Sequence, residues 1–136
     1  MERQMKVLIA DDQPTTRRGL KALLALLPQV EVVGEAGDGR ESLDLVAECR
    51  PDVVLMDVQM PVMNGVEATR CIKRDWPEVK VIALTMYAGH RAEALAAGAD
   101  AFLVKDGAAD VLAGAILAQV SDLSYFTRSG EPGIPN

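Results

Sequence analysis

Residues 53–65 read VVLMDVQMPVMNG, and this stretch decides how the rest of the chain folds. Its first four residues are apolar without interruption, which is typical of a strand covered on both faces in a parallel sheet. The strand ends at a carboxylate, Asp57, and Pro61 with Asn64 and Gly65 then turns the chain. Open α/β sheets bind ligands at the carboxyl ends of such strands, so Asp57 is a candidate site residue.

A second apolar run, residues 7–10, is also followed directly by carboxylates, Asp11 and Asp12. Strand and amphipathic helix patterns then alternate along the chain. Strands are predicted over residues 6–10, 30–36, 53–56, 80–85 and 101–105, and helices over residues 15–27, 39–49, 66–75, 89–97 and 109–121. Strict alternation predicts parallel strands, right-handed crossovers and helices on both faces. The expected fold class is α/β, a flavodoxin-like (βα)5 doubly wound parallel sheet with strand order 2-1-3-4-5.

This strand order predicts that five polar side chains converge at one edge of the sheet. The switch point between the first and third strands brings Asp11, Asp12 and Asp57 together. The fourth and fifth strands end in Thr85 and Lys105 at the same edge. Two carboxylates about 4 Å apart repel by about 4 kcal/mol at an effective dielectric of 20, so three need more than one ammonium. A hard cation such as Mg²⁺ supplies this compensation and leaves positions for phosphoryl oxygens.

Carboxylates, a cation, a hydroxyl and an ammonium together indicate a phosphoryl-transfer site. An aspartate can be the nucleophile in such a site, which gives an aspartyl phosphate. Asp57 is the candidate phosphoacceptor because it ends the central strand, and the adjacent Asp11 and Asp12 are candidates for a cation clamp. Three of these residues also have an ordinary structural interpretation: Asp12 as a helix cap, Thr85 as a strand end and Lys105 as a solvated charge.

The ordered set of motifs resembles the receiver domain of two-component response regulators, a CheY-like fold, and specifically its NarL/LuxR-like branch. The resemblance covers about residues 5–120. The residues that carry it are Asp11-Asp12, Asp57 followed by MPVMNG, Thr85 closing VIALT, and Lys105 after AGADAFLV. The resemblance implies a phosphoacceptor that switches an output partner or domain, in transcriptional control. It implies no enzymatic turnover beyond autophosphorylation and slow autodephosphorylation.

The resemblance also implies a role for each matched residue. Asp57 is expected to accept the phosphoryl group from a sensor histidine kinase. Mg²⁺ is expected to bind Asp12, Asp57 and the backbone carbonyl of Gln59, with Asp11 acting mostly through water. Thr85 and Lys105 are expected to hold the phosphoryl group.

Phe102 matches the aromatic residue that swings inward as a switch in this family, although an ordinary core position is an equal interpretation. Residues 85–98, TMYAGHRAEALAAG, are shorter than the family pattern by less than one helical turn. We therefore expect a short or displaced fourth helix and weak coupling between Phe102 and Asp57. This departure keeps a second function open, a phosphorylation-independent interaction module on the same fold.

Other classes with related chemistry fit the sequence less well. A haloacid-dehalogenase-like phosphatase needs a second aspartate two residues after its nucleophile, where this chain has Gln59. A flavin or nucleotide binder needs a phosphate-cradling loop after the first strand, where Asp11 and Asp12 would repel phosphate.

Composition limits the partners and the cellular location. With 14 basic and 20 acidic residues the net charge is −6, which argues against direct nucleic-acid binding because phosphate contacts need clustered Lys and Arg. Two isolated cysteines indicate a reducing compartment, and no apolar segment is long enough to span a membrane, so a cytoplasmic protein is expected. The expected partners are a sensor histidine kinase and an output protein or DNA-binding domain. A phosphorylation-dependent homodimer is left open.

The chain is expected to hold one receiver domain over residues 1–123. Residues 124–136, with Gly and Pro twice each, are expected to form a flexible tail or linker. Whether the chain is a fragment of a longer regulator or a stand-alone receiver is left open by the sequence.

Overall fold

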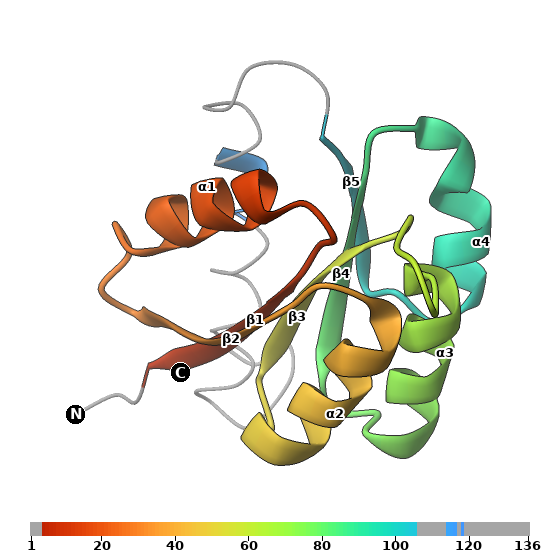
Figure 1. Ribbon diagram of the computed structural model, residues 1–136, viewed down its shortest axis with the longest axis horizontal. Helices are drawn as coiled ribbons and strands as arrows, with labels where there is room; N and C mark the ends of the chain where they lie inside the picture. The colour runs from red at the N-terminus through yellow and green to blue at the C-terminus, as the bar shows by residue number, and fades with distance from the viewer. Residues whose placement is uncertain (1–3, 106–113, 117, 119–136) are drawn as a thin grey trace, which may run out of the picture.

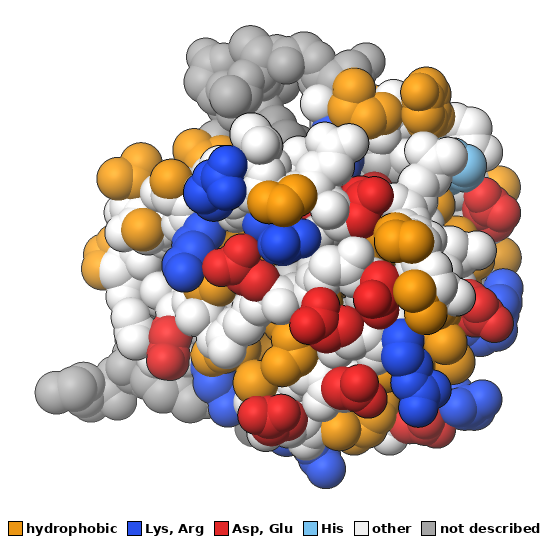
Figure 2. Space-filling view, in the orientation of Figure 1, with side chains coloured by type: hydrophobic (Ala, Val, Ile, Leu, Met, Phe, Trp, Pro, Cys, Tyr) orange, Lys and Arg blue, Asp and Glu red, His pale blue; other side chains and the backbone are white. Residues whose placement is uncertain are grey.

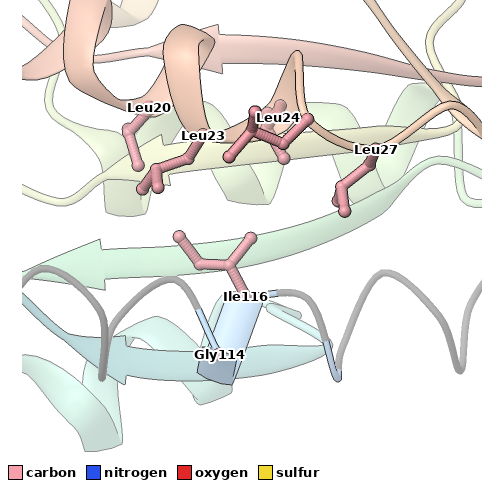
Figure 3. Close-up of a pocket in the computed structure, with 7 residues that line it drawn as sticks. Leu20, Leu23, Leu24, Leu27, Gly114 and Ile116 are labelled. Atoms are coloured by element: carbon pink, nitrogen blue, oxygen red, sulfur yellow. The ribbon is translucent and has the colours of Figure 1, made fainter.

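The computed structural model describes residues 4–105, 114–116 and 118, which form a sheet with helices on both faces (Figure 1). The five strands are β1 (Met5–Ala10), β2 (Val30–Ala36), β3 (Val53–Asp57), β4 (Lys80–Thr85) and β5 (Ala101–Val104). The pairs between neighbouring strands are all parallel, and the strand order is β2-β1-β3-β4-β5. The predicted fold class and strand order are therefore confirmed.

The helices occupy the connections between these strands. They are α1 (Pro14–Leu24), α2 (Gly39–Cys49), α3 (Gly65–Asp75), a 3₁₀ turn η1 (Ala88–His90) and α4 (Arg91–Ala96). Residues 114–116 and 118 are also helical, within the predicted last helix. The remainder of that helix and the predicted tail, residues 124–136, lie outside the described residues.

Two apolar clusters pack on opposite faces of the sheet. One joins the sheet to α2, α3 and α4, through side chains such as Val46, Ile72 and Ala94. The other joins the sheet to α1 and Ile116, through Leu20 and Leu24. Figure 1 shows α1 on one side of the sheet and α2, α3 and α4 on the other. All five residues of β3 are buried, as expected for a strand covered on both faces.

The structure corrects the predicted end of the first helix. The apolar pattern continues to Leu27, but α1 ends at Leu24. The backbone N–H groups of Leu26 and Leu27 reach back only three residues, to Leu23 and Leu24. This tightened turn precedes Pro28, which disfavours helical backbone at the residue before it.

The fourth helix is short, in agreement with the expectation from the sequence. The segment after β4 forms the 3₁₀ turn η1 and then only the six residues of α4. Gly98 follows with a φ of 107°, a left-handed conformation that suits glycine and ends the helix. Within the described part of the chain, the helices are too short or too polar to cross a lipid bilayer.

Candidate functional site

The candidate site lies at the carboxyl edge of the sheet, where four strands end. Asp57 is the last residue of β3. Asp11 directly follows β1, the strand that is hydrogen-bonded to β3. Thr85 is the last residue of β4, and Lys105 directly follows β5. Because all these strands are parallel, their carboxyl ends share one edge, and the side chains that follow them lie close together.

Three carboxylates meet at this edge. Oxygen atoms of Asp11, Asp12 and Asp57 all lie within 4.8 Å of one another. Asp11 and Asp57 are buried, whereas Asp12 is exposed. At such separations, three negative charges repel strongly unless a cation is present. A donor set made only of oxygen atoms suits a hard cation such as Mg²⁺, so the residues present fit the metal that the sequence predicts.

Lys105 supplies one positive charge between two of these acids. Its Nζ lies 2.8 Å from Asp11 Oδ2 and 3.5 Å from Asp57 Oδ1. Only 10% of the Lys105 side chain is exposed, so its interpretation as a solvated charge is wrong. One ammonium against three carboxylates leaves the cluster with a net negative charge, which favours cation binding.

The Asp57 carboxyl group is harder to ionise than an ordinary aspartate. Its pKa is raised from 3.8 to about 6, mainly because the group is buried, and the negative charge of Asp11 contributes to this rise. Lys105 opposes this shift, and so does the backbone N–H of Gln59, which donates to Asp57 Oδ1 at 3.3 Å. A group with this pKa is still mostly ionised at pH 7, so Asp57 presents a poorly solvated carboxylate at the site.

The two adjacent acids differ in how fully they are bonded. Asp11 Oδ1 accepts from the Gln13 backbone N–H at 2.9 Å, and Asp11 Oδ2 accepts from Lys105 at 2.8 Å. Asp12 is exposed and lines the cleft beside Asp57. The interpretation of Asp12 as a helix cap is wrong, because the N-cap position of α1 is Gln13.

A cleft opens over the phosphoacceptor candidate. Its lining residues are Asp12, Gln13, Thr16, Asp57, Gln59, Met86 and Lys105. This set contains the candidate phosphoacceptor, an exposed acid and an ammonium on one open surface. Gln13, Thr16 and Met86 were not predicted from the sequence, since nothing in their spacing marks them as site residues.

Thr85 and Phe102, like Asp11, are predicted site residues that are not among those lining this cleft. Thr85 is buried, and its Oγ1 accepts from the Tyr87 backbone N–H at 3.3 Å. The backbone carbonyl of Thr85 accepts from the Lys105 backbone N–H at 2.6 Å, and this bond fixes the backbone from which the Lys105 side chain extends. Phe102 is half-buried and packs against the apolar cluster on the α2, α3 and α4 face. This packing agrees with the interpretation of Phe102 as a core residue, and its role as a switch stays a prediction.

The loop after β3 is held close to the backbone of Asp57. The Gly65 N–H donates to the Val58 carbonyl at 2.8 Å, and a Cβ at Gly65 would lie 1.9 Å from the Asp57 carbonyl oxygen. Asn64 caps α3 by accepting from the Glu67 N–H at 2.9 Å. Glycine is therefore required at position 65 for the close approach of α3 to the site.

Arg17, on the first turn of α1, contacts the backbone of Asp11. Its Nη1 donates to the Asp11 carbonyl oxygen, and its Nε lies 3.3 Å from Glu35 Oε1 on β2. The sequence did not point to this residue. The only signal is a basic residue about two turns after the acids, which is common on an exposed helix face.

His90 ends the 3₁₀ turn η1 that precedes α4. It is half-buried, and its Nδ1 lies 2.7 Å from Glu93 Oε1. Both residues line a second hollow that shares Asp12 and Gln59 with the cleft.

Comparison with known proteins places these features in one family. The response regulator receiver domain family matches residues 7–117. The transcriptional regulatory protein LnrK of Bacillus subtilis (strain 168) is 43% identical over 115 residues, covering 83% of this chain and 52% of LnrK. The response regulator protein VraR of Staphylococcus aureus (strain Mu3 / ATCC 700698) is 40% identical over 114 residues, covering 82% of this chain and 54% of VraR. The chain thus spans about half the length of these curated relatives.

A solved structure agrees with this similarity. The signal receiver domain of the putative response regulator NarL from Mycobacterium tuberculosis superposes with a TM-score of 0.79 at 31% identity, covering 88% of this chain and 98% of that domain. The fold, the carboxylate cluster and the sequence similarity lead to the same conclusion. The chain belongs to the response regulator receiver domains, in their NarL/LuxR-like branch.

Proposed function

We propose that Asp57 accepts a phosphoryl group from a sensor histidine kinase in a Mg²⁺-dependent reaction, and that the modified domain switches an output partner. One observation carries the proposal: the buried Asp57 carboxylate lies beside Asp11, Asp12 and the Lys105 ammonium, and faces an open cleft. Buried acids at a sheet edge with no chemical role would be paired one to one. This cluster instead has more carboxylates than cations.

The transfer step uses one oxygen of Asp57. This oxygen attacks the phosphorus of a phosphohistidine, an O–P bond forms and the N–P bond breaks. The electron pair of the broken bond stays on the imidazole nitrogen, which takes a proton from solvent. The ammonium of Lys105 is near enough to stabilise the negative charge on the phosphoryl oxygens during transfer.

The proposed metal ligands are Asp12, Asp57 and the backbone carbonyl of Gln59, with Asp11 acting through water. Mg²⁺ held by these residues would supply positive charge that offsets the negative charge of the transferring phosphoryl group. The bonding of Asp11 supports its indirect role, since both its carboxylate oxygens already accept hydrogen bonds from protein donors. The exposure of Asp12 supports a direct one.

We further propose that Thr85 and Lys105 hold the phosphoryl group after transfer. The Lys105 side chain already faces the acids. The Thr85 side chain is buried and is not among the residues that line the cleft, so we propose that the residues after β4 shift before its O–H can donate to a phosphoryl oxygen. Such a rearrangement is a local switch. We propose only weak coupling of this switch to Phe102, because Phe102 packs in the core and α4 is short.

The output is proposed to lie outside this chain. The curated relatives are transcriptional regulators about twice as long as the matched segment, which supports a DNA-binding output domain or a separate output protein. A phosphorylation-dependent homodimer stays a prediction. We propose a cytoplasmic location, which the two free cysteines support. Catalysis by the chain itself is limited in this proposal to autophosphorylation and autodephosphorylation.

Intact-protein mass spectrometry after incubation with acetyl phosphate tests the proposal. We expect the gain of a single phosphoryl group with Mg²⁺, and no gain without Mg²⁺ or in Asp57→Asn. Asp44→Asn, an exposed acid on α2, is the matched control and should react like the wild type. A folded wild type that gains nothing with Mg²⁺ would contradict the proposal and favour a phosphorylation-independent interaction module.

A further inference from the structure

We propose that Arg17 is a positioning residue that holds the acid pair, Asp11 and Asp12, in the orientation that binds the metal. This inference rests on the proposed function and assigns a part of the same site. Arg17 lies on α1, and its Nη1 donates to the Asp11 carbonyl oxygen. Its side chain is 19% exposed, and it is not among the residues that line the cleft. Arg17 therefore acts on the site through the backbone.

The peptide bond between Asp11 and Asp12 couples the positions of the two acids. A peptide unit is planar, so the position of the Asp11 carbonyl fixes the position of the Asp12 N–H and Cα. The preceding peptide unit is fixed as well, because the Asp11 N–H donates to the Ala36 carbonyl at 2.9 Å. Arg17 thereby completes the fixation of the backbone from Asp11 to Asp12.

Backbone fixation is most important for Asp12. The Asp11 carboxylate is held by two protein donors, Gln13 and Lys105. The Asp12 side chain is exposed, and its direction depends on the backbone that carries it. A shift of the Asp11–Asp12 peptide would move the Asp12 carboxylate away from Asp57, to which it now lies close. Loss of Arg17 would therefore weaken cation binding without removing a ligand.

Arg17 is itself held in place from the edge strand of the sheet. Its Nε lies 3.3 Å from Glu35 Oε1, and Lys21 Nζ lies 3.3 Å from Glu35 Oε2. A Cβ at Gly37 would lie 3.5 Å from Arg17 Nη1, so the chain after β2 passes close to the guanidinium. The planar guanidinium can bond Glu35 and the Asp11 carbonyl together, whereas a lysine ammonium lacks this fork geometry.

Mg²⁺ titration of the purified chain by isothermal calorimetry, together with thermal melts, tests this role. We expect Arg17→Gln to bind Mg²⁺ about tenfold more weakly than the wild type, as is typical when a residue that orients metal ligands is removed. Arg17→Lys should fall between the two. Arg18→Gln is the matched control, because Arg18 is an exposed residue on the same helix with the same charge, bonded to Thr15 Oγ1 at 3.5 Å. It should bind like the wild type.

The melts separate positioning from simple packing. If Arg17 only joined α1 to the sheet, its loss would lower Tm without metal but leave the Mg²⁺ affinity and the Mg²⁺-induced rise in Tm unchanged. That result would overturn the inference. If Arg17→Gln does not fold, Glu35→Ala provides the same test, since it removes the partner that holds Arg17; an affinity equal to that of the wild type would again overturn it. A wild type that binds no Mg²⁺ would instead overturn the proposed metal site itself, and the inference with it.

The comparison of the two glutamine variants also tests for a purely electrostatic effect. Arg17→Gln and Arg18→Gln each remove one positive charge from α1, so a long-range effect would strengthen Mg²⁺ binding slightly in both. Weaker binding in Arg17→Gln alone is the result that the backbone contact predicts. The backbone amide NMR signals of Gln13 and Asp12 should also shift in metal-free Arg17→Gln and stay in place in Arg18→Gln.

Discussion

The ammonium of Lys105 lies 3.5 Å from Asp57 Oδ1, although their strands, β5 and β3, are separated by β4. Lys105 reaches across the end of β4, where its backbone N–H bonds to the Thr85 carbonyl. Despite this nearby cation, the pKa of Asp57 is raised to about 6. Burial therefore outweighs the ion pair, and the site is destabilised when Asp57 is ionised and no metal is bound.

The first prediction concerns the pH dependence of stability without Mg²⁺. The folded-state pKa of Asp57, about 6, lies above its ordinary value of 3.8, so between these values the folded state binds more protons than the unfolded state. The free energy of unfolding should therefore fall as pH rises from about 4 to about 6, by on the order of 3 kcal/mol. Urea unfolding of the wild type at a series of pH values measures this fall.

Asp57→Asn is the control for this prediction, since it replaces the carboxyl group with a neutral group of the same shape. The variant should be more stable than the wild type at pH 7 and similar to it near pH 4. Equal stability of the two proteins across the whole range would show that burial does not destabilise the ionised Asp57 carboxylate.

The second prediction separates the two adjacent acids. Asp12→Asn should weaken Mg²⁺ binding at least about tenfold, as expected for a direct ligand, and leave metal-free stability nearly unchanged because Asp12 is exposed. Asp11→Asn should lower metal-free stability by about 1 kcal/mol, because it removes the 2.8 Å pair with the largely buried Lys105 side chain while Lys105 keeps Asp57 at 3.5 Å. Calorimetric titration and urea unfolding of both variants check the two halves. A reversed pattern would mean that the roles of the acids are exchanged.

The third prediction concerns the close approach of α3 to the site. Gly65→Ala should destabilise the fold by about 3 kcal/mol, because the added Cβ would lie 1.9 Å from the Asp57 carbonyl oxygen and the backbone must move. Gly19→Ala is the matched control: Gly19 is an interior residue of α1 with no atom within 4 Å of an added Cβ, and this substitution should stabilise by about 0.5 to 1 kcal/mol. Chemical denaturation measures both. Tolerance of alanine at position 65 would contradict the packing described here.

The fourth prediction concerns the switch. The side chain of Phe102 packs against the core and α4 has only six residues, so we expect its ring resonances to shift only partly when beryllofluoride and Mg²⁺ are added as a phosphoryl mimic. The ring of Trp76, in the turn between α3 and β4, serves as the reference that should not move. A complete shift of the Phe102 ring signals to a new position would contradict weak coupling.

Much of the fold could be predicted because its signals are local. An uninterrupted apolar run marks β3, which is buried at every residue. Pro51 follows the end of α2, and Asn64 and Gly65 mark the start of α3. The convergence of Asp11 and Asp57 then follows from parallel topology alone, because these acids directly end neighbouring strands.

The remaining features depend on side-chain geometry, which periodicity does not encode. The contact between Arg17 and the Asp11 carbonyl depends on how far a guanidinium reaches back over a helix start. The hydroxyl of Thr85 was placed at the correct strand end, but its bond to the Tyr87 N–H depends on the turn after β4. The early end of α1 comes from the three-residue hydrogen bonds of Leu26 and Leu27, which precede Pro28.

The central claim is that Asp57 carries the phosphoryl group, and chemical trapping of the acyl phosphate tests it most directly. Borohydride reduces an aspartyl phosphate to homoserine, so peptide mapping after reaction with acetyl phosphate and Mg²⁺ locates the modified residue. The account predicts homoserine at position 57 and at no other aspartate. Homoserine at Asp11 or Asp12 with Asp57 intact would contradict it.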